Sequence, residues 1–237
     1  MTDPAAGGLL ARFAAARQDL GRSSTAARIA DLLREQITNG ELRPGERLPE
    51  EELCKAAKVS RNTLREAFRL LAHERLLVHE FNRGVFVNKL TADDLVDLFH
   101  VRRILECEGV RHAGGAAPGA IAALDAAVAD GERAAARDDW RGVGTANIRF
   151  HQGLAALCGS PRVDEMMRHL LAELRLVFDV MGSPREFHEP YLARNRELTT
   201  ILQRGEFAIA ERELRMYLDD AERQIAGRYR EREQAAG

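Results

Sequence analysis

The 237-residue chain has few cysteines, few aromatic residues and no dominant charge. Its three cysteines, Cys54, Cys107 and Cys158, lie far apart and form no Cys-x-x-Cys motif. This spacing argues against a disulfide framework and against a thiolate zinc site, so a reducing cytoplasm is the expected compartment. Uncharged runs are too short to span a bilayer, and no secretory signal is visible, so we expect no membrane partner.

The net charge of −2 argues against a protein that coats nucleic acid with a globally basic surface, but the charge is unevenly distributed. Residues 22–89 carry 13 Lys/Arg and 10 Asp/Glu, whereas residues 90–237 carry 20 and 25. Residues 22–89 can therefore bind an anionic polymer, whereas residues 90–237 cannot bind one over a large part of their surface. With 45% hydrophobic residues the chain can form packed cores, and its length suits two domains.

Residues 22–89 show the signals of a small DNA-binding fold. A first helix precedes Pro49, where proline followed by three glutamates begins a short second helix, and Ser60 is a good N-cap for a third. Two apolar segments at 76–80 and 85–87 flank a turn that contains Asn and Gly. The order helix, helix, turn, helix, hairpin predicts a winged helix-turn-helix.

The helix after Ser60 carries arginine at every fourth position, opposite its apolar stripe. A helix that enters the major groove needs such a face, because guanidinium groups match guanine O6 and N7 or phosphate. The hairpin tip adds an arginine beside a glycine. A solvated basic helix face is the alternative, but the complete element order favours DNA contact. The predicted DNA-binding residues are Ser60, Arg61, Asn62, Thr63, Arg65, Arg69, Arg83 and Gly84.

After a capping motif at Thr91–Asp94, the sequence shows only helical patterns. We expect helices at roughly 92–112, 118–137, 139–158, 161–182, 188–204 and 206–231. The predicted fold class is mainly α, with an N-terminal winged helix-turn-helix followed by an all-α helical-bundle effector domain. The predicted boundaries are a flexible tail at 1–21, a DNA-binding domain at 22–89, an effector-binding and dimerisation domain at 90–232 and a tail at 233–237.

Several polar residues of the second domain occupy positions where helical periodicity predicts apolar ones. Buried polar groups cost free energy unless they are paired, so several in one bundle suggest a polar internal cavity. For any single position, a satisfied core residue or the edge of a stripe is the more common case, and Arg102 can pair with Glu106 on its own helix. The predicted effector-binding residues are Arg102, Asn147, His151, Asn195 and Tyr217.

Parts of the sequence resemble GntR-family bacterial transcription regulators. The DNA-binding half carries the resemblance in three segments, 40–49, 59–67 and 70–77. The second half, with Arg102–Glu106 and Phe150-His151, resembles the helical FCD effector domain of the FadR-type subfamily. The resemblance implies a homodimer that binds a palindromic operator in double-stranded DNA and responds to a small effector.

One departure from the family pattern lies in the DNA-binding half. The family often has an arginine that contacts DNA at the position of Glu51. A carboxylate there would repel phosphate, so we expect Glu51 to make no such contact. The operator sequence of relatives therefore does not transfer to this chain.

A second departure concerns metal binding. Many FadR-type effector domains hold a divalent metal with one Asp and three His. By spacing, only His151 remains here, while Asn147, Asn195 and Tyr217 replace the other ligands. One imidazole with amide and phenol partners is a poor Zn²⁺, Ni²⁺ or Mn²⁺ site, so we expect no family-type metal and no cofactor. The same residues suit hydrogen bonds to an organic effector, and Arg102 favours an anion.

These patterns predict a ligand-responsive, sequence-specific DNA-binding transcription regulator, with repression as the expected sign. One alternative is an effector-blind DNA-binding protein whose helical domain only dimerises, and another is a regulator with a metal-assisted carboxylate site. An enzyme that uses His151 as a base is not expected, because the sequence supplies no matched nucleophile, paired carboxylate or phosphate loop.

Overall fold

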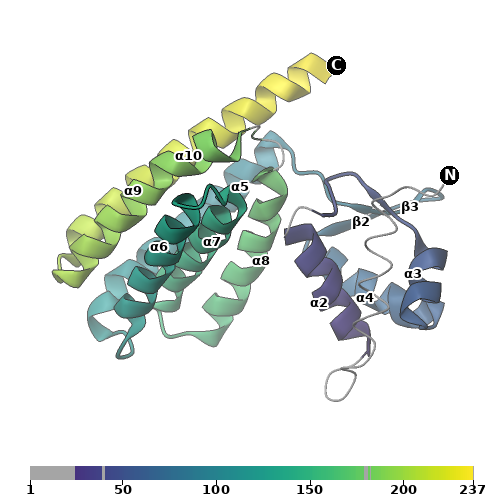
Figure 1. The fold of residues 1–237 in the computed structure, drawn as a ribbon, viewed down its shortest axis with the longest axis horizontal. Helices are drawn as coiled ribbons and strands as arrows, with labels where there is room; N and C mark the ends of the chain where they lie inside the picture. The colour runs from purple at the N-terminus through teal and green to yellow at the C-terminus, as the bar shows by residue number, and fades with distance from the viewer. Residues whose placement is uncertain (1–24, 39–40, 179–180, 182, 237) are drawn as a thin grey trace. The chain divides into compact units, whose positions relative to one another are not determined.

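The computed structural model of the protein describes residues 25–38, 41–178, 181 and 183–236 (Figure 1). The chain divides into two compact units between Lys89 and Leu90. The predicted N-terminal tail at 1–21 lies outside the described residues.

The first unit is a winged helix-turn-helix, as the sequence predicted. Its three strands form one sheet in the order β1-β3-β2, and both strand pairs are antiparallel. Strand β1 was not predicted, because two residues are too few to show a strand pattern. The described elements are α2 (Thr25–Thr38), β1 (Arg47–Leu48), α3 (Glu50–Ala57), α4 (Arg61–His73), β2 (Leu77–Glu80) and β3 (Gly84–Val87).

Capping and core packing fix the orientation of α4. The Ser60 hydroxyl accepts a hydrogen bond from the backbone N–H of Thr63 at 3.1 Å, which satisfies one open donor at the helix start. Leu64, Phe68 and Leu71 are buried, and α4 packs against α2. Because one side of α4 is buried in this way, its polar side faces solvent.

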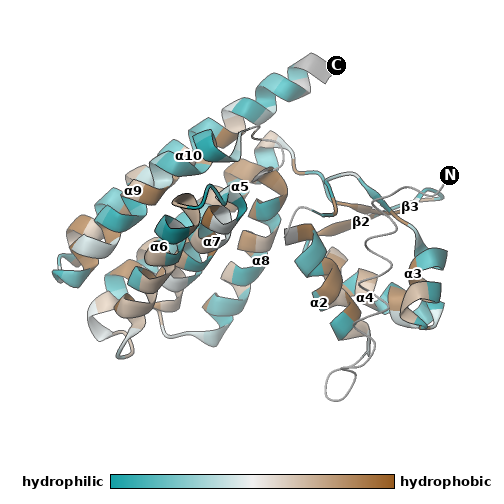
Figure 2. Ribbon diagram, viewed as in Figure 1, coloured by the Kyte–Doolittle hydropathy of each residue, from teal (hydrophilic) through white to brown (hydrophobic). Residues whose placement is uncertain are grey.

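The second unit is an all-helical bundle. Helix α7 packs against α5, α6, α8 and α9, and α10 packs against α5 and α9. Hydrophobic residues recur along every helix of the unit between hydrophilic ones, as Figure 2 shows. The elements are α5 (Ala92–His112), the short 3₁₀ helix η2 (Ala113–Gly115), α6 (Ala120–Ala135), α7 (Trp140–Ala156), α8 (Pro161–Phe178), α9 (Pro184–Gln203) and α10 (Phe207–Ala236).

Helices α6 and α7 lie within two residues of their predicted bounds, and the predicted end of α8 at 182 falls outside the described residues, whereas α9 and α10 differ more. Helix α9 begins at Pro184 rather than near residue 188, because Ser183 caps it and proline is favourable in the first turn. Helix α10 continues through Ala236 into the segment expected as a C-terminal tail at 233–237. The residues at the end of α10 are mostly Arg, Glu, Gln and Ala, which are all strong helix formers.

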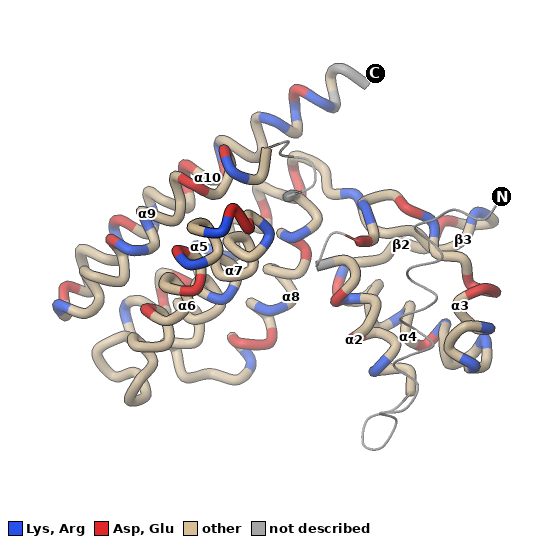
Figure 3. Tube along the Cα trace, viewed as in Figure 1, with Lys and Arg blue, Asp and Glu red and all other residues tan. Residues whose placement is uncertain are grey.

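Charged residues of both signs are interleaved along the outer helices, and α10 shows this well in Figure 3. Interleaved charges keep a long helix compatible with water and allow pairs between neighbouring turns. Within the described ranges, every helix is too short or too polar to cross a membrane.

Candidate functional site

The exposed side of α4 is the first candidate site. Arg61, Arg65 and Arg69 are all exposed there, together with Asn62. The side chain of Thr63 is half-buried, and its hydroxyl lies 2.8 Å from that of Ser60. The structure therefore places the predicted arginines on one accessible helix face, and the capped N-terminal end of α4 is open as well.

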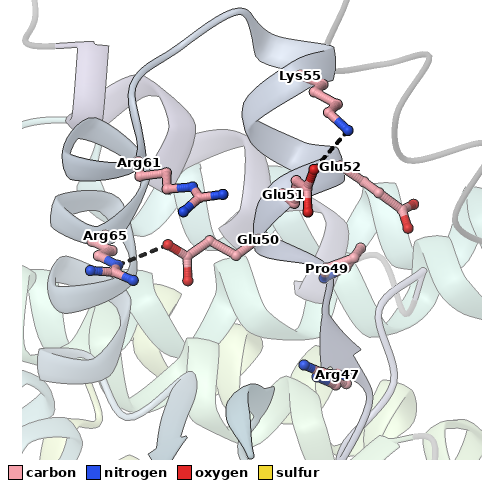
Figure 4. Close-up of a pocket in the computed structure, with 8 residues that line it drawn as sticks. All are labelled: Arg47, Pro49, Glu50, Glu51, Glu52, Lys55, Arg61 and Arg65. Atoms are coloured by element: carbon pink, nitrogen blue, oxygen red, sulfur yellow. Dashed lines mark hydrogen bonds and ion pairs between the residues drawn. The ribbon is translucent and has the colours of Figure 1, made fainter.

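An open hollow with a volume of about 530 Å³ lies between the start of α3 and this face (Figure 4). Arg65 donates a hydrogen bond from Nε to Glu50 Oε1 at 2.8 Å, across the turn between the two helices. Lys55 pairs with Glu51 on α3, with 2.8 Å between Nζ and Oε1. The other lining residues are Arg47, Pro49, Glu52 and Arg61.

The hairpin between β2 and β3 places its own arginine at the tip. Gly84 has a φ of +114°, which side chains rarely adopt, so glycine is required at this turn. Arg83 forms an ion pair with Glu80, and its guanidinium carbon lies 5.5 Å from the centre of the Phe86 ring. Arg83 is therefore exposed but restrained by neighbours on its own hairpin.

The second candidate site is a buried network in the helical bundle. Glu106 of α5 links Arg102 to His151. Its Oε1 accepts a hydrogen bond from Arg102 Nε at 2.7 Å, and its Oε2 lies 2.6 Å from His151 Nδ1. On the far side of the imidazole, His151 Nε2 lies 3.0 Å from the Tyr217 hydroxyl. Each of these four side chains is at most 2% exposed.

The network continues to α9 through an amide pair. Asn195 donates from Nδ2 to Asn147 Oδ1 at 2.7 Å, and the Tyr217 hydroxyl lies 3.3 Å from the same oxygen. All five predicted effector-binding residues therefore meet in one network, which spans α5, α7, α9 and α10. Sequence reasoning gave Glu106 only as a possible partner of Arg102 and missed its contact with His151.

Comparison with known families decides the identity of the chain. Residues 25–87 match the bacterial regulatory proteins of the gntR family, and residues 97–220 match the FCD domain. The chain belongs to the GntR family. It is a DNA-binding transcription regulator with an FCD domain, which confirms this part of the sequence-based prediction.

Relatives of this GntR regulator differ in how much they share with it. A crystal structure of a GntR-type regulator from Rhodococcus sp. RHA1 is 45% identical, with a TM-score of 0.82, and covers 86% of this chain and 99% of that one. The galactonate operon transcriptional repressor of Escherichia coli is 30% identical over 64% of this chain and 75% of its own length. The Nta operon transcriptional regulator of Aminobacter aminovorans is 46% identical over 29% of this chain, and the chain spans only 33% of that relative.

Burial and pairing set the protonation of the GntR regulator's buried network. Burial alone would raise the pKa of Glu106, but Arg102 and His151 outweigh it and lower that pKa. Burial lowers the pKa of His151, although Glu106 opposes this, and burial raises the pKa of Tyr217. At neutral pH the carboxylate is therefore ionised and the imidazole neutral.

This protonation state fixes the direction of the hydrogen bonds. A carboxylate can only accept, so the neutral imidazole of His151 donates from Nδ1 to Glu106. Its Nε2 then accepts the single hydroxyl proton of Tyr217, so in this state the 3.3 Å contact between that hydroxyl and Asn147 Oδ1 is not a hydrogen bond. The charges of Arg102 and Glu106 cancel, so the network of the GntR regulator has no net charge.

Two buried polar atoms of the network have no hydrogen-bond partner among the described residues. They are Arg102 Nη2, a donor, and Asn195 Oδ1, an acceptor. Both residues are only 2% exposed, so water does not readily compensate them. The two atoms belong to residues at opposite ends of the network.

Exchanging Glu51 for arginine tests which side of α3 faces DNA in this GntR regulator. The side chain is 66% exposed and pairs with Lys55, which lowers the pKa of Glu51. We expect Glu51→Arg to tighten nonspecific duplex binding and to steepen its salt dependence by about one phosphate contact. Fluorescence anisotropy with a random-sequence duplex at several salt concentrations measures both effects. An unaltered salt slope would show that position 51 points away from the DNA.

Proposed function

We propose that the protein is a ligand-responsive repressor that binds a palindromic operator as a homodimer. The observation that carries the DNA part is the exposed arginine face of α4 behind its Ser60 cap. The galactonate operon repressor, a relative at 30% identity, supports repression as the sign of regulation. Operator DNA lies in the bacterial cytoplasm, which is therefore the proposed place of action.

Dimerisation follows from how few bases one helix can contact. A single recognition helix contacts only a few base pairs, so useful specificity needs two copies about one turn of DNA apart. We propose that the helical unit supplies or orients the contact between the two copies. Sedimentation at micromolar concentration tests this, with and without operator DNA. Monomer under both conditions would contradict the proposal.

The exposed position of Arg65 on α4 makes it the sharpest test of DNA recognition. We expect Arg65→Ala to weaken specific operator binding by about 1–3 kcal/mol, because a bidentate arginine–guanine contact has roughly that effect. Fluorescence anisotropy with the native operator measures the loss. Arg149→Ala is the matched control, since Arg149 is exposed on α7 of the helical unit and pairs with Asp130 at 3.3 Å. Equal affinities for the two variants would remove Arg65 from the contact set.

The buried network supports a small organic effector with both an acceptor and a donor group. An acceptor such as a carboxylate oxygen would satisfy Arg102 Nη2, and a hydroxyl would donate to Asn195 Oδ1. Hydroxy acids carry both groups, and the galactonate operon repressor is named for one. Because Glu106 already neutralises Arg102, we expect the hydroxyl to matter as much as the negative charge.

Thermal-shift screening separates this sensor from a protein whose helical unit only dimerises. Hydroxy acids should raise the melting temperature, and the matching acids without hydroxyls should do so less, because a ligand of the folded state stabilises it. Asn195→Ala should remove the difference between the two sets of acids. No stabilisation by any small acid, sugar or acyl-CoA compound would favour the effector-blind alternative.

We propose that the network works without a transition metal. The residues do not fit the family-type metal site, because both ring nitrogens of His151 are already engaged, by Glu106 and by Tyr217. Asn147 and Asn195 bond to each other, and neither amide carries the charge of a carboxylate.

Metal analysis of protein purified without chelator should therefore find well below one ion per chain. Chelator should leave the melting temperature unchanged, since a metal bound to the folded state would otherwise stabilise it. Combining Asn147→Asp, Asn195→His and Tyr217→His should create metal-dependent stabilisation. Stoichiometric metal bound through His151 in the natural protein would instead support the metal-assisted carboxylate site.

A further inference from the structure

We propose that Glu50 determines DNA specificity by positioning Arg65: its carboxylate holds the guanidinium in the orientation that recognises a guanine. The inference rests on the proposed sequence-specific DNA binding and adds to it a residue that does not itself touch the base. Glu50 is the first residue of α3, whereas Arg65 lies in the middle of α4, 15 residues later.

The atom that Glu50 engages leaves the useful edge of the guanidinium open. The carboxylate accepts from Nε of Arg65 at 2.8 Å, and among the described residues no hydrogen bond from Nη1 or Nη2 of Arg65 accompanies it. The two terminal nitrogens form the fork that matches O6 and N7 of guanine. A carboxylate on Nε therefore fixes the plane of the fork without blocking it.

The exposure of the pair argues for orientation rather than stability. The side chains of Arg65 and Glu50 are 59% and 32% exposed. Ion pairs this open to water contribute little to folding stability. A free arginine side chain, however, loses much rotamer freedom when it binds, and a preset geometry reduces that loss.

The neighbouring acid provides an internal control. Glu51 is on the same turn of α3, but its carboxylate pairs with Lys55 on its own helix, with 2.8 Å between Oε1 and Nζ. Dashed lines in Figure 4 mark this pair and the pair between Glu50 and Arg65. Glu50 and Glu51 thus place similar negative charge beside the hollow, and the pair with Arg65 is made by Glu50. A purely long-range charge effect should make the two acids nearly equivalent.

The test begins with operators selected by the full-length protein from a pool of randomised duplexes. A guanine position that wild type selects and that Arg65→Ala loses identifies the base that Arg65 contacts. Affinities are then measured on duplexes that differ only at that position. Wild type should prefer guanine at least about fivefold.

The variants separate positioning from charge. Glu50→Ala should lose most of the guanine preference. Glu50→Gln should keep an intermediate preference, because the amide oxygen still accepts from Nε although the charge is gone. Glu51→Ala should keep the full preference. Both alanine variants should bind random-sequence DNA more tightly and to a similar extent, because each removes one negative charge near phosphate.

Several outcomes would overturn the proposal. These are an unchanged guanine preference in Glu50→Ala, equal losses in Glu50→Ala and Glu50→Gln, and an equal loss in Glu51→Ala. If Glu50→Ala does not fold, as judged by thermal melting, the guanine preferences of Glu50→Gln and Glu51→Gln are compared instead. A reduced preference in Glu50→Gln alone supports the proposal, and equal preferences in the two variants contradict it. If wild type selects no sequence at all, the proposed function fails as well. If selection persists but Arg65→Ala loses no position, only the present inference fails.

Discussion

Replacing Glu106 with alanine should lower the free energy of unfolding of the helical unit by about 3–5 kcal/mol, the range for breaking a buried ion pair. Arg102 and Glu106 are 2% and 0% exposed, and 2.7 Å separates Arg102 Nε from Glu106 Oε1. Without the carboxylate, a guanidinium remains buried with no compensating charge. The Nδ1 donor of His151 loses its partner at the same time.

Thermal and denaturant unfolding of the full chain measure this loss. Glu189→Ala is the control, because Glu189 forms an exposed pair with Arg185 at 3.1 Å, and such a pair contributes little to stability. A double variant, Arg102→Met with Glu106→Leu, should recover part of the loss, since it leaves no charge buried. A loss in Glu106→Ala as small as that of the control would mean that water reaches Arg102.

Local signals predicted most of the fold. Helix α5 begins and ends where its capping motif and composition placed it, and Thr91 and Asp94 form the reciprocal capping box. Strand β1 was missed because its two residues gain their structure from a distant partner, strand β3. The start of α9 was placed too late: Ser183 caps the helix, Pro184 lies in its first turn, and Pro190 lies inside it.

The candidate sites were predicted less completely, since their pairings depend on how helices face one another. The apolar stripes and the family resemblance indicated that Asn147, His151, Asn195 and Tyr217 converge. They did not show that Glu106 bonds to His151, because these residues are 45 positions apart on different helices. Spacing along a single helix carries no information on such contacts, and the same limit applies to the contact between α3 and α4.

Acidification between pH 6.5 and 4 should destabilise the helical unit through His188. This residue of α9 is 3% exposed, and burial lowers its pKa to about 4, with a further contribution from Arg175. Packing around it is tight, since a Cβ added at Gly144 would lie 2.9 Å from His188 Nε2. The neutral imidazole is therefore the form that the fold accommodates.

The sign of the effect follows from the two pKa values of His188. In the unfolded chain the pKa is about 6.5, so that state binds the proton first as the pH falls. The contribution of His188 to the free energy of unfolding is fully present above pH 6.5 and declines as the pH falls below that value. The decline ends once His188 is protonated in the folded state as well, near pH 4. A difference of roughly 2.5 units corresponds to about 3 kcal/mol, at about 1.4 kcal/mol per unit.

The measurement is the change of melting temperature with pH, compared between wild type and His188→Gln. His151 also has a lowered pKa, so wild type carries both contributions, and the difference between the two slopes isolates His188. Glu106 contributes to the loss of stability only below its unfolded pKa of about 4.5. Between pH 6.5 and 4.5 the loss therefore comes from His188 and His151. His112→Gln is the control, since His112 is 58% exposed at the end of α5. Parallel slopes for wild type and His188→Gln would show that His188 is protonated equally in both states, and that its surroundings in the folded bundle admit water.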